Sequence, residues 1–166
     1  KTQKDAAKVR NVDQKPPVKS QPALSKDEDQ PPAQKTQEYA EEIATLDQTI
    51  KDEPKKARAF FNRGMVYIRM KEYELTIEDF NRAIELNPAA VGAYYNRVSA
   101  YYELGRQDQA LDDYQAALKL APEDEDLYYN RAVIHLKKEH RRKALSDMKK
   151  AASLGQAQAI AYLKRE

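Results

Sequence analysis

The 166-residue sequence contains no cysteine and no tryptophan, and it has only four glycines. Without cysteine the chain has no disulfides, thiolate metal sites or cysteine nucleophiles, and the redox compartment stays undetermined. The mean hydropathy is −0.92, and no apolar run approaches the roughly 18 residues that a membrane-crossing helix needs. The net charge of +2 predicts no general attraction to nucleic acid. These absences exclude a transmembrane segment and argue against a nucleic-acid partner.

Catalytic and metal-binding signatures are missing as well. The sequence has no glycine-rich phosphate loop and no Gly-x-Ser-x-Gly motif. Its two histidines, His135 and His140, are five residues apart, which is not the i, i+4 spacing that places two ligands on one helix face. We therefore expect no cofactor, no metal ion and no enzymatic activity.

Residues 1–35 hold five of the eight prolines, many lysines and glutamines, and hardly any large apolar side chains. Such a segment cannot bury enough surface to offset the ordering entropy of its backbone, about 1–2 kcal/mol per residue. The composition predicts a disordered tail or tether. The alternative is a segment that orders on contact with a partner.

From Thr36 onward the sequence repeats itself. Pro54, Pro88 and Pro122 are spaced 34 residues apart, and an exact period of this size indicates a helical solenoid. Within residues 54–158 the period defines three units, at 57–90, 91–124 and 125–158. In each unit, two stretches with apolar residues at helical spacing flank a short polar turn, which predicts a helical hairpin. The prolines follow the second helix, which their rings cannot extend.

These units resemble the tetratricopeptide repeat (TPR) family. The family motif asks for an aromatic, a small residue and another aromatic in the first helix, then alanine, an aromatic, alanine and a closing proline. The first two units match it with Phe60, Gly64, Tyr67, Phe80, Ala83 and Pro88, and with Tyr94, Tyr101, Ala110, Tyr114, Ala117 and Pro122. The third unit is degenerate, with His135 and Met148 at aromatic positions, as is common in terminal repeats.

Two flanking helices are expected to complete the array. Tyr39, Ile43, Leu46 and Ile50 form one apolar stripe, so residues 36–53 are predicted to be a helix that covers the first repeat. A short helix that begins near residue 157 and ends within 159–166 should cap the third repeat. The resemblance thus implies an all-α fold, a right-handed αα-superhelix with capping helices at both ends.

Charged residues recur with the same period. Each first helix carries an arginine at its seventh position, and each second helix carries an aspartate sixteen residues further on. The pairs are Arg63 with Asp79, Arg97 with Asp113 and Arg131 with Asp147. Because a buried arginine needs a partner, the threefold copy predicts a ladder of ion pairs between helices. A row of cations for a ligand is the alternative.

In TPR arrays the first helix of each repeat lines a concave groove, and the resemblance predicts the same here. The expected peptide-binding residues are Asn62, Asn96, Asn130, Phe61, Tyr95, Tyr129 and Tyr102. Asparagine offers a donor and an acceptor, so a row of asparagines can hold the backbone of an extended peptide beside aromatic anchors. The alternative is that these asparagines cap or pack the helices.

One known TPR specificity does not fit the sequence. The clamp that holds the C-terminal carboxylate of cytosolic chaperones uses lysine, asparagine and arginine at five groove positions. This chain has Phe61, Met65, Asn96, Asp126 and Asn130 there. Only Asn96 fits, and Asp126 would repel a carboxylate, so capture of chaperone tails is not expected.

The charge changes sign along the array. Residues 36–53 carry six acids and one lysine, a net charge of −5, whereas residues 127–166 carry ten bases and three acids, a net charge of +7. The basic end is either a solvated face or a contact for an acidic partner, a phosphate-bearing surface or the acidic end of another copy. We therefore expect a non-enzymatic adaptor that binds a protein or peptide partner. A scaffold that self-associates end to end, a homo-oligomer, is the alternative.

The wording of the repeats also indicates an origin. The Tyr-Asn-Arg openings and the Ala-Ala-x-Leu-Gly close are similar to bacterial repeats. A tether rich in proline and lysine ahead of such an array resembles envelope-anchored lipoproteins. The expectation that follows is a bacterial cell-envelope or periplasmic protein whose anchor is not part of this sequence.

Overall fold

The computed structural model describes residues 33–165, and side chains from residue 36 onward. The chain divides into two units, residues 1–30 and 31–166. The predicted disordered tail, residues 1–35, lies almost entirely outside the described residues.

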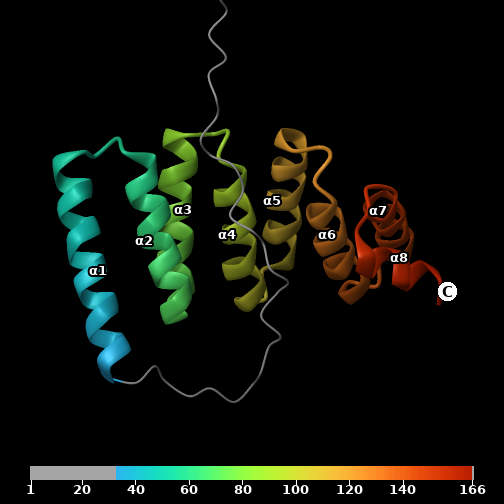
Figure 1. Cartoon of the computed structure of the whole chain (residues 1–166), viewed down its shortest axis with the longest axis horizontal. Coiled ribbons are helices and arrows are strands. Elements are labelled where there is room, and N and C mark those ends of the chain that lie inside the picture. The colour runs from blue at the N-terminus through green and yellow to red at the C-terminus, as the bar shows by residue number, and fades with distance from the viewer. Residues whose placement is uncertain (1–32, 166) are drawn as a thin grey trace, which may run out of the picture. The chain divides into compact units, whose positions relative to one another are not determined.

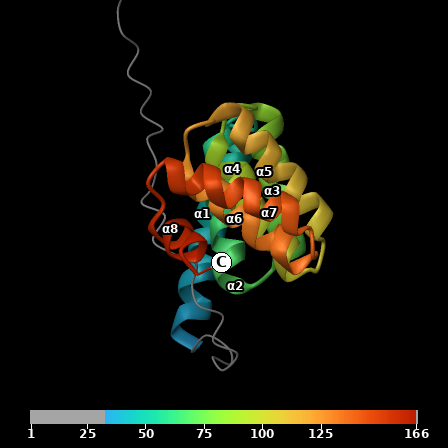
Figure 2. The same cartoon turned by 90° about the vertical axis from the view of Figure 1, so that its right-hand side faces the viewer.

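The described part of the chain is all-α. Its helices are α1 (Ala33–Asp52), α2 (Ala57–Met70), α3 (Tyr73–Leu86), α4 (Val91–Glu103), α5 (Gln107–Leu120), α6 (Glu125–Lys137), α7 (Arg141–Ser153) and α8 (Ala157–Leu163). They follow one another in chain order in Figure 1, and the main contacts join successive helices. Figure 2 looks along the row from the side of α7 and α8. The all-α solenoid that the period predicts is confirmed.

Each repeat turns from its first helix to its second through a left-handed residue. These residues are Lys71, Gly105 and Glu139, with φ angles of 62°, 71° and 58°. The following backbone N–H then donates to the carbonyl five residues earlier, as from Glu72 to Tyr67 at 2.9 Å. This arrangement is a Schellman motif, which satisfies carbonyls at the end of the first helix. Only the second repeat uses glycine, which adopts this backbone conformation without steric cost.

The core follows the repeat period. Phe80, Tyr114 and Met148 occupy one position of the second helices and are at most 4% exposed. Small residues surround them at the other inward positions: Ala83, Ala110, Ala117, Ala144 and Ala151 are at most 1% exposed. A β-carbon added at Gly64 would lie 3.3 Å from the Phe80 ring, so a small residue is needed there for the two helices to approach. Alternation of large and small side chains thus sets the hairpin spacing.

We expected from the sequence that all the motif aromatics would be core residues, and this prediction was wrong for several of them. Phe60 is buried, but Tyr94, Tyr101 and Tyr128 are only half-buried. The hydroxyls of Tyr94 and Tyr128 donate to the carbonyls of the preceding Pro88 and Pro122, at 3.3 and 3.2 Å. These hydrogen bonds explain the partial burial, because the rings pack while their polar tips reach the surface.

The flanking helices pack as the sequence indicates. Helix α1 begins at Ala33 rather than Thr36, ends at Asp52 and packs against α2. Helix α8 packs against α7, and Gln156 caps it by accepting from the backbone N–H groups of Gln158 and Ala159. Among the described helices, none combines the length and the apolarity that crossing a membrane requires.

Candidate functional site

The predicted arginine–aspartate ladder is present. Arg63, Arg97 and Arg131 each donate two hydrogen bonds to the aspartate sixteen residues on, at 2.5–2.8 Å. The aspartates are buried, and the arginine side chains are 14–22% exposed. The hydrogen bond to its aspartate raises the pKa of Arg63, so the guanidinium remains charged. The ladder joins the two helices of each repeat. Its arginines are bound to aspartates of the same chain and do not form a row of free cations for a ligand.

Two of these arginines, Arg63 and Arg97, also donate a hydrogen bond to the preceding helix. Arg63 donates to Asp47 of α1, and Arg97 donates to Asn81 of α3, each at 2.5 Å. Arg97 also lies 5.7 Å from the ring centroids of both Tyr94 and Tyr101. Each of these two guanidinium groups therefore ties three helices together and orients the first helix on which the candidate groove residues lie.

The three asparagines occupy equivalent helical positions but differ in environment. Asn62 on α2 is exposed and makes no hydrogen bond within the described part of the chain. Asn96 on α4 is half-buried and donates to the Gly92 carbonyl at 2.7 Å. Asn130 on α6 is 7% exposed and donates to the Tyr95 hydroxyl at 3.3 Å. The asparagine row is therefore not uniform, and only Asn62 offers its whole amide to a ligand.

The aromatic members of the predicted site are half-buried and partly committed to packing. Phe61 lies edge-on against Phe80, with 5.4 Å between ring centroids, and Tyr95 lies likewise against Tyr114 at 6.2 Å. Tyr129 packs against the core of the third repeat. The Lys137 ammonium group makes a cation–π contact with Tyr102, 4.4 Å from its ring centroid. Burial raises the pKa of Tyr95, so its hydroxyl stays protonated near neutral pH.

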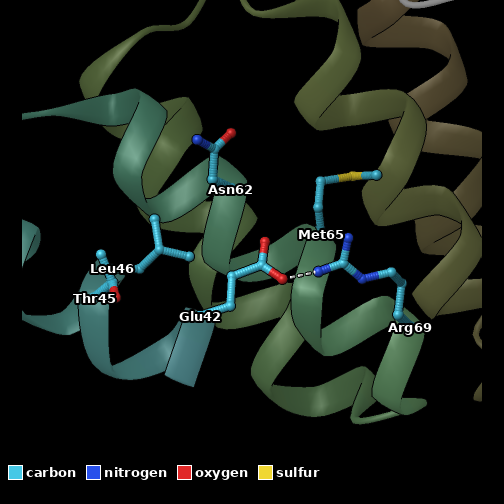
Figure 3. A pocket seen from close by; sticks show the side chains of 6 residues that line it. All are labelled: Glu42, Thr45, Leu46, Asn62, Met65 and Arg69. Atoms are coloured by element: carbon cyan, nitrogen blue, oxygen red, sulfur yellow. Dashed lines mark hydrogen bonds and ion pairs between the residues drawn. The ribbon is translucent and has the colours of Figure 1, made fainter. Parts of the chain in front are cut away.

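A cavity of about 390 Å³ lies between α1 and α2, next to Asn62 (Figure 3). We call it the α1–α2 cavity; its lining residues are Glu42, Thr45, Leu46, Asn62, Met65 and Arg69. Leu46 and Met65 supply apolar surface, and Asn62 and Arg69 lie two helical turns apart on α2. Glu42 and Arg69 form an ion pair across the cavity, and Arg69 also lies 5.3 Å from the Tyr39 ring centroid.

Sequence reasoning identified Asn62 in this cavity but not the cavity itself. Met65 and Arg69 lie at positions that face the groove in the TPR family, so the sequence could have predicted that they line this cavity. The contribution of Glu42, Thr45 and Leu46 had none, because it depends on how α1 packs beside α2. No group of three or more potential metal ligands gathers anywhere among the described residues.

The helical hairpins, their fixed period and the repeated ion pairs define a helical-repeat protein. Family comparison specifies which repeat: residues 57–89 and 125–154 match the family described as tetratricopeptide repeat, and residues 99–139 match the one described as TPR repeat. The chain belongs to the TPR family, whose members generally serve as non-enzymatic protein-interaction modules.

Solved structures with the same fold include several of MamA. One MamA crystal structure has a TM-score of 0.68 and 19% identity, covering 79% of this chain and 88% of that one. MamA from residue 41 to the end, from Desulfovibrio magneticus RS-1, gives 0.66 and 22%, with coverage of 75% and 71%. MamA MSR-1 gives 0.64 and 25%, also with 75% and 71%. No curated protein sequence matches the chain.

Proposed function

We propose that this chain is a non-enzymatic adaptor that holds an extended peptide or a helix of a partner protein along α2, α4 and α6. The observation that carries the proposal is the α1–α2 cavity, where an exposed asparagine with no hydrogen-bond partner among residues 36–165 lies beside apolar surface. Three of the other predicted residues, Asn96, Tyr102 and Tyr129, lie on the next two first helices, α4 and α6. They would extend the contact along the array.

The cavity has the properties of an anchor site for one apolar side chain. Its volume of about 390 Å³ accommodates a leucine, methionine or phenylalanine side chain. Full burial of such a side chain contributes about 1.5–3 kcal/mol, and this open cavity would supply part of that. Met65 is flexible and can adapt to the shape of the side chain that enters. The amide of Asn62 can then bind the peptide backbone next to the anchor, which leaves side-chain selection to the cavity.

The test is a binding screen with matched variants. The wild-type chain is screened against an immobilised library of 12-residue peptides, and the Kd of the best binder is compared with that for Asn62→Ala and for Gln109→Ala. The second variant removes an exposed amide on α5, away from the cavity. Loss of one peptide hydrogen bond should raise Kd about fivefold for Asn62→Ala alone. Equal Kd values for wild type and Asn62→Ala would contradict the proposal.

The charge distribution supports a second candidate, an end-to-end scaffold. In the second unit the acids concentrate on α1 and the bases on α7, at opposite ends of the row in Figure 1. Contacts between unlike ends are heterologous and build chains rather than closed dimers. Light scattering at low and high salt tests this. Oligomers that dissociate with salt would favour the scaffold, and a monomer in both conditions would exclude it.

A further inference from the structure

Helix α7 carries a one-signed face that differs from the matching faces of the other repeats. Arg142, Lys143, Lys149 and Lys150 form what we call the basic strip. All four are exposed, and Ser146 and Ser153, also exposed, lie between them on the same side of the helix. The buried residues of α7, Ala144, Asp147, Met148 and Ala151, lie on the opposite side. The basic strip thus points away from the core of the array.

The basic strip lacks internal counter-charges. Within the described residues none of its four cations forms an ion pair, and the one acid of α7, Asp147, is bound to Arg131. Lys150 has an aromatic neighbour, the Tyr128 ring, 6.0 Å from its ammonium group, which does not neutralise its charge. The other basic residues of the neighbouring turn have partners. Lys138 forms an ion pair with Asp108 at 2.8 Å, and Lys137 lies over Tyr102. The unneutralised charge is therefore concentrated on one helix face.

The equivalent positions of the other second helices do not carry a row of bases. Helix α5 has Asp108, Gln109, Gln115 and Ala116 there, and helix α3 has Glu74, Leu75, Asn81 and Arg82. The row of four bases is therefore confined to one second helix of the array. A bilayer surface extends in all directions and would face Asp112 of α5 as well as the strip. A single acidic segment matches the width of the strip.

We propose that the basic strip is a second docking surface, separate from the candidate groove, for an acidic segment of a partner protein. The cations form two pairs seven residues apart, which is about 10.5 Å along the helix. A helical partner would match them with carboxylates seven residues apart, and an extended partner with carboxylates about three residues apart. With both surfaces in use, the chain joins two segments on different faces of one array.

The probe is a helical 16-residue alanine-based peptide with two Glu-Glu pairs seven residues apart. Its isomer with four consecutive glutamates serves as the control for spacing. The strip variant is Arg142→Gln/Lys143→Gln/Lys149→Gln/Lys150→Gln. The matched variant Lys51→Gln/Lys55→Gln/Lys119→Gln/Lys164→Gln removes four exposed lysines elsewhere and changes the net charge equally. Melting of the helical circular-dichroism signal establishes that both variants fold.

We expect the spaced peptide to bind wild type and the matched variant alike, and the strip variant at least about tenfold more weakly, because each exposed ion pair contributes a factor of about two to five. Asn62→Ala should leave this Kd unchanged, which separates the strip from the groove. Equal binding of the strip variant, or of the consecutive-glutamate isomer, would overturn the proposal. So would binding to phosphatidylserine vesicles without binding to the peptide, or self-association that the strip variant abolishes.

Discussion

The Arg97–Asp113 pair gives the sharpest test of how the array is held together. The side chains of Arg97 and Asp113 are 14% and 7% exposed, and they share two hydrogen bonds of 2.8 and 2.5 Å. Removing one partner of a buried pair leaves an uncompensated charge and costs about 3–5 kcal/mol. We expect Arg97→Met and Asp113→Ala each to cost about 3 kcal/mol, near the lower limit because the guanidinium is partly hydrated.

A double-mutant cycle isolates the pair from the other contacts of Arg97. Arg97→Met also removes the hydrogen bond to Asn81. This loss occurs in both the single and the double variant, so it cancels in the coupling energy. The double variant should therefore cost about 4 kcal/mol rather than about 6, a coupling of about 2 kcal/mol. Urea unfolding followed by circular dichroism measures the four free energies.

A second cycle provides the control. The exposed pair of Arg82 and Glu85, with side chains 46% and 63% exposed, should show a coupling below about 0.5 kcal/mol. If the Arg97–Asp113 coupling is as small as that of this exposed pair, the ladder does not hold the helices together. The recurrence of the arginine and the aspartate would then need another explanation.

Three further predictions concern the core, the turns and pH. Phe80→Ala should lower the free energy of unfolding by about 3–5 kcal/mol in urea unfolding, because the ring is fully buried, whereas Leu75→Ala at an exposed site should change it by less than about 0.5 kcal/mol. Lys71→Gly should raise the free energy of unfolding by about 1 kcal/mol and Gly105→Ala should lower it by about 1 kcal/mol, because both residues have positive φ. The melting temperature should rise and fall accordingly. Burial lowers the pKa of His135 below its usual 6.5. The folded protein should therefore keep its full stability above pH 6.5 and lose stability as the pH falls below 6.5. Urea unfolding at pH 7 and pH 5 should show this loss in wild type and a smaller loss in His135→Tyr.

The charges around His135 set the size of that pH effect. Arg131, Lys143 and His140 disfavour a positive imidazole, and Asp147 favours it. Asp147 is already bound to Arg131, and the buried His135 Nδ1 atom has no hydrogen-bond partner in the part of the chain that the structure describes. Protonation therefore adds a cation to a largely basic environment. A stability difference between wild type and His135→Tyr that does not change with pH would contradict this explanation.

The sequence predicts much of this fold because its informative contacts are local and periodic. Arg63 and Asp79 are sixteen residues apart, a spacing set by one hairpin, and the same spacing recurs in each repeat. The positions of the helices and the ion-pair ladder can be predicted from such short spacings in the sequence. The partial burial of Tyr94 does not, since it depends on how its ring and hydroxyl meet the turn that contains Pro88.

The candidate site was harder to predict because it depends on contacts between repeats. Identical residue types at one motif position predict one environment, yet Asn62 is exposed and Asn130 is buried. The difference arises because Asn130 meets the hydroxyl of Tyr95 on the preceding first helix, whereas Asn62 faces α1. Helix α1 has the register of a second helix, in which Leu46 takes the position of Phe80 and Tyr114, and Leu46 lines the cavity beside Asn62.

The proposed function requires that a partner peptide bind along the first helices and enter the α1–α2 cavity. The most direct measurement is an NMR titration of the 15N-labelled chain with the tightest peptide from the library screen. We predict that amide and side-chain shifts concentrate at Asn62, Met65 and Arg69 and continue through Asn96 and Tyr102. Shifts confined to the outer faces of α3, α5 and α7, with the cavity residues unchanged, would contradict the account.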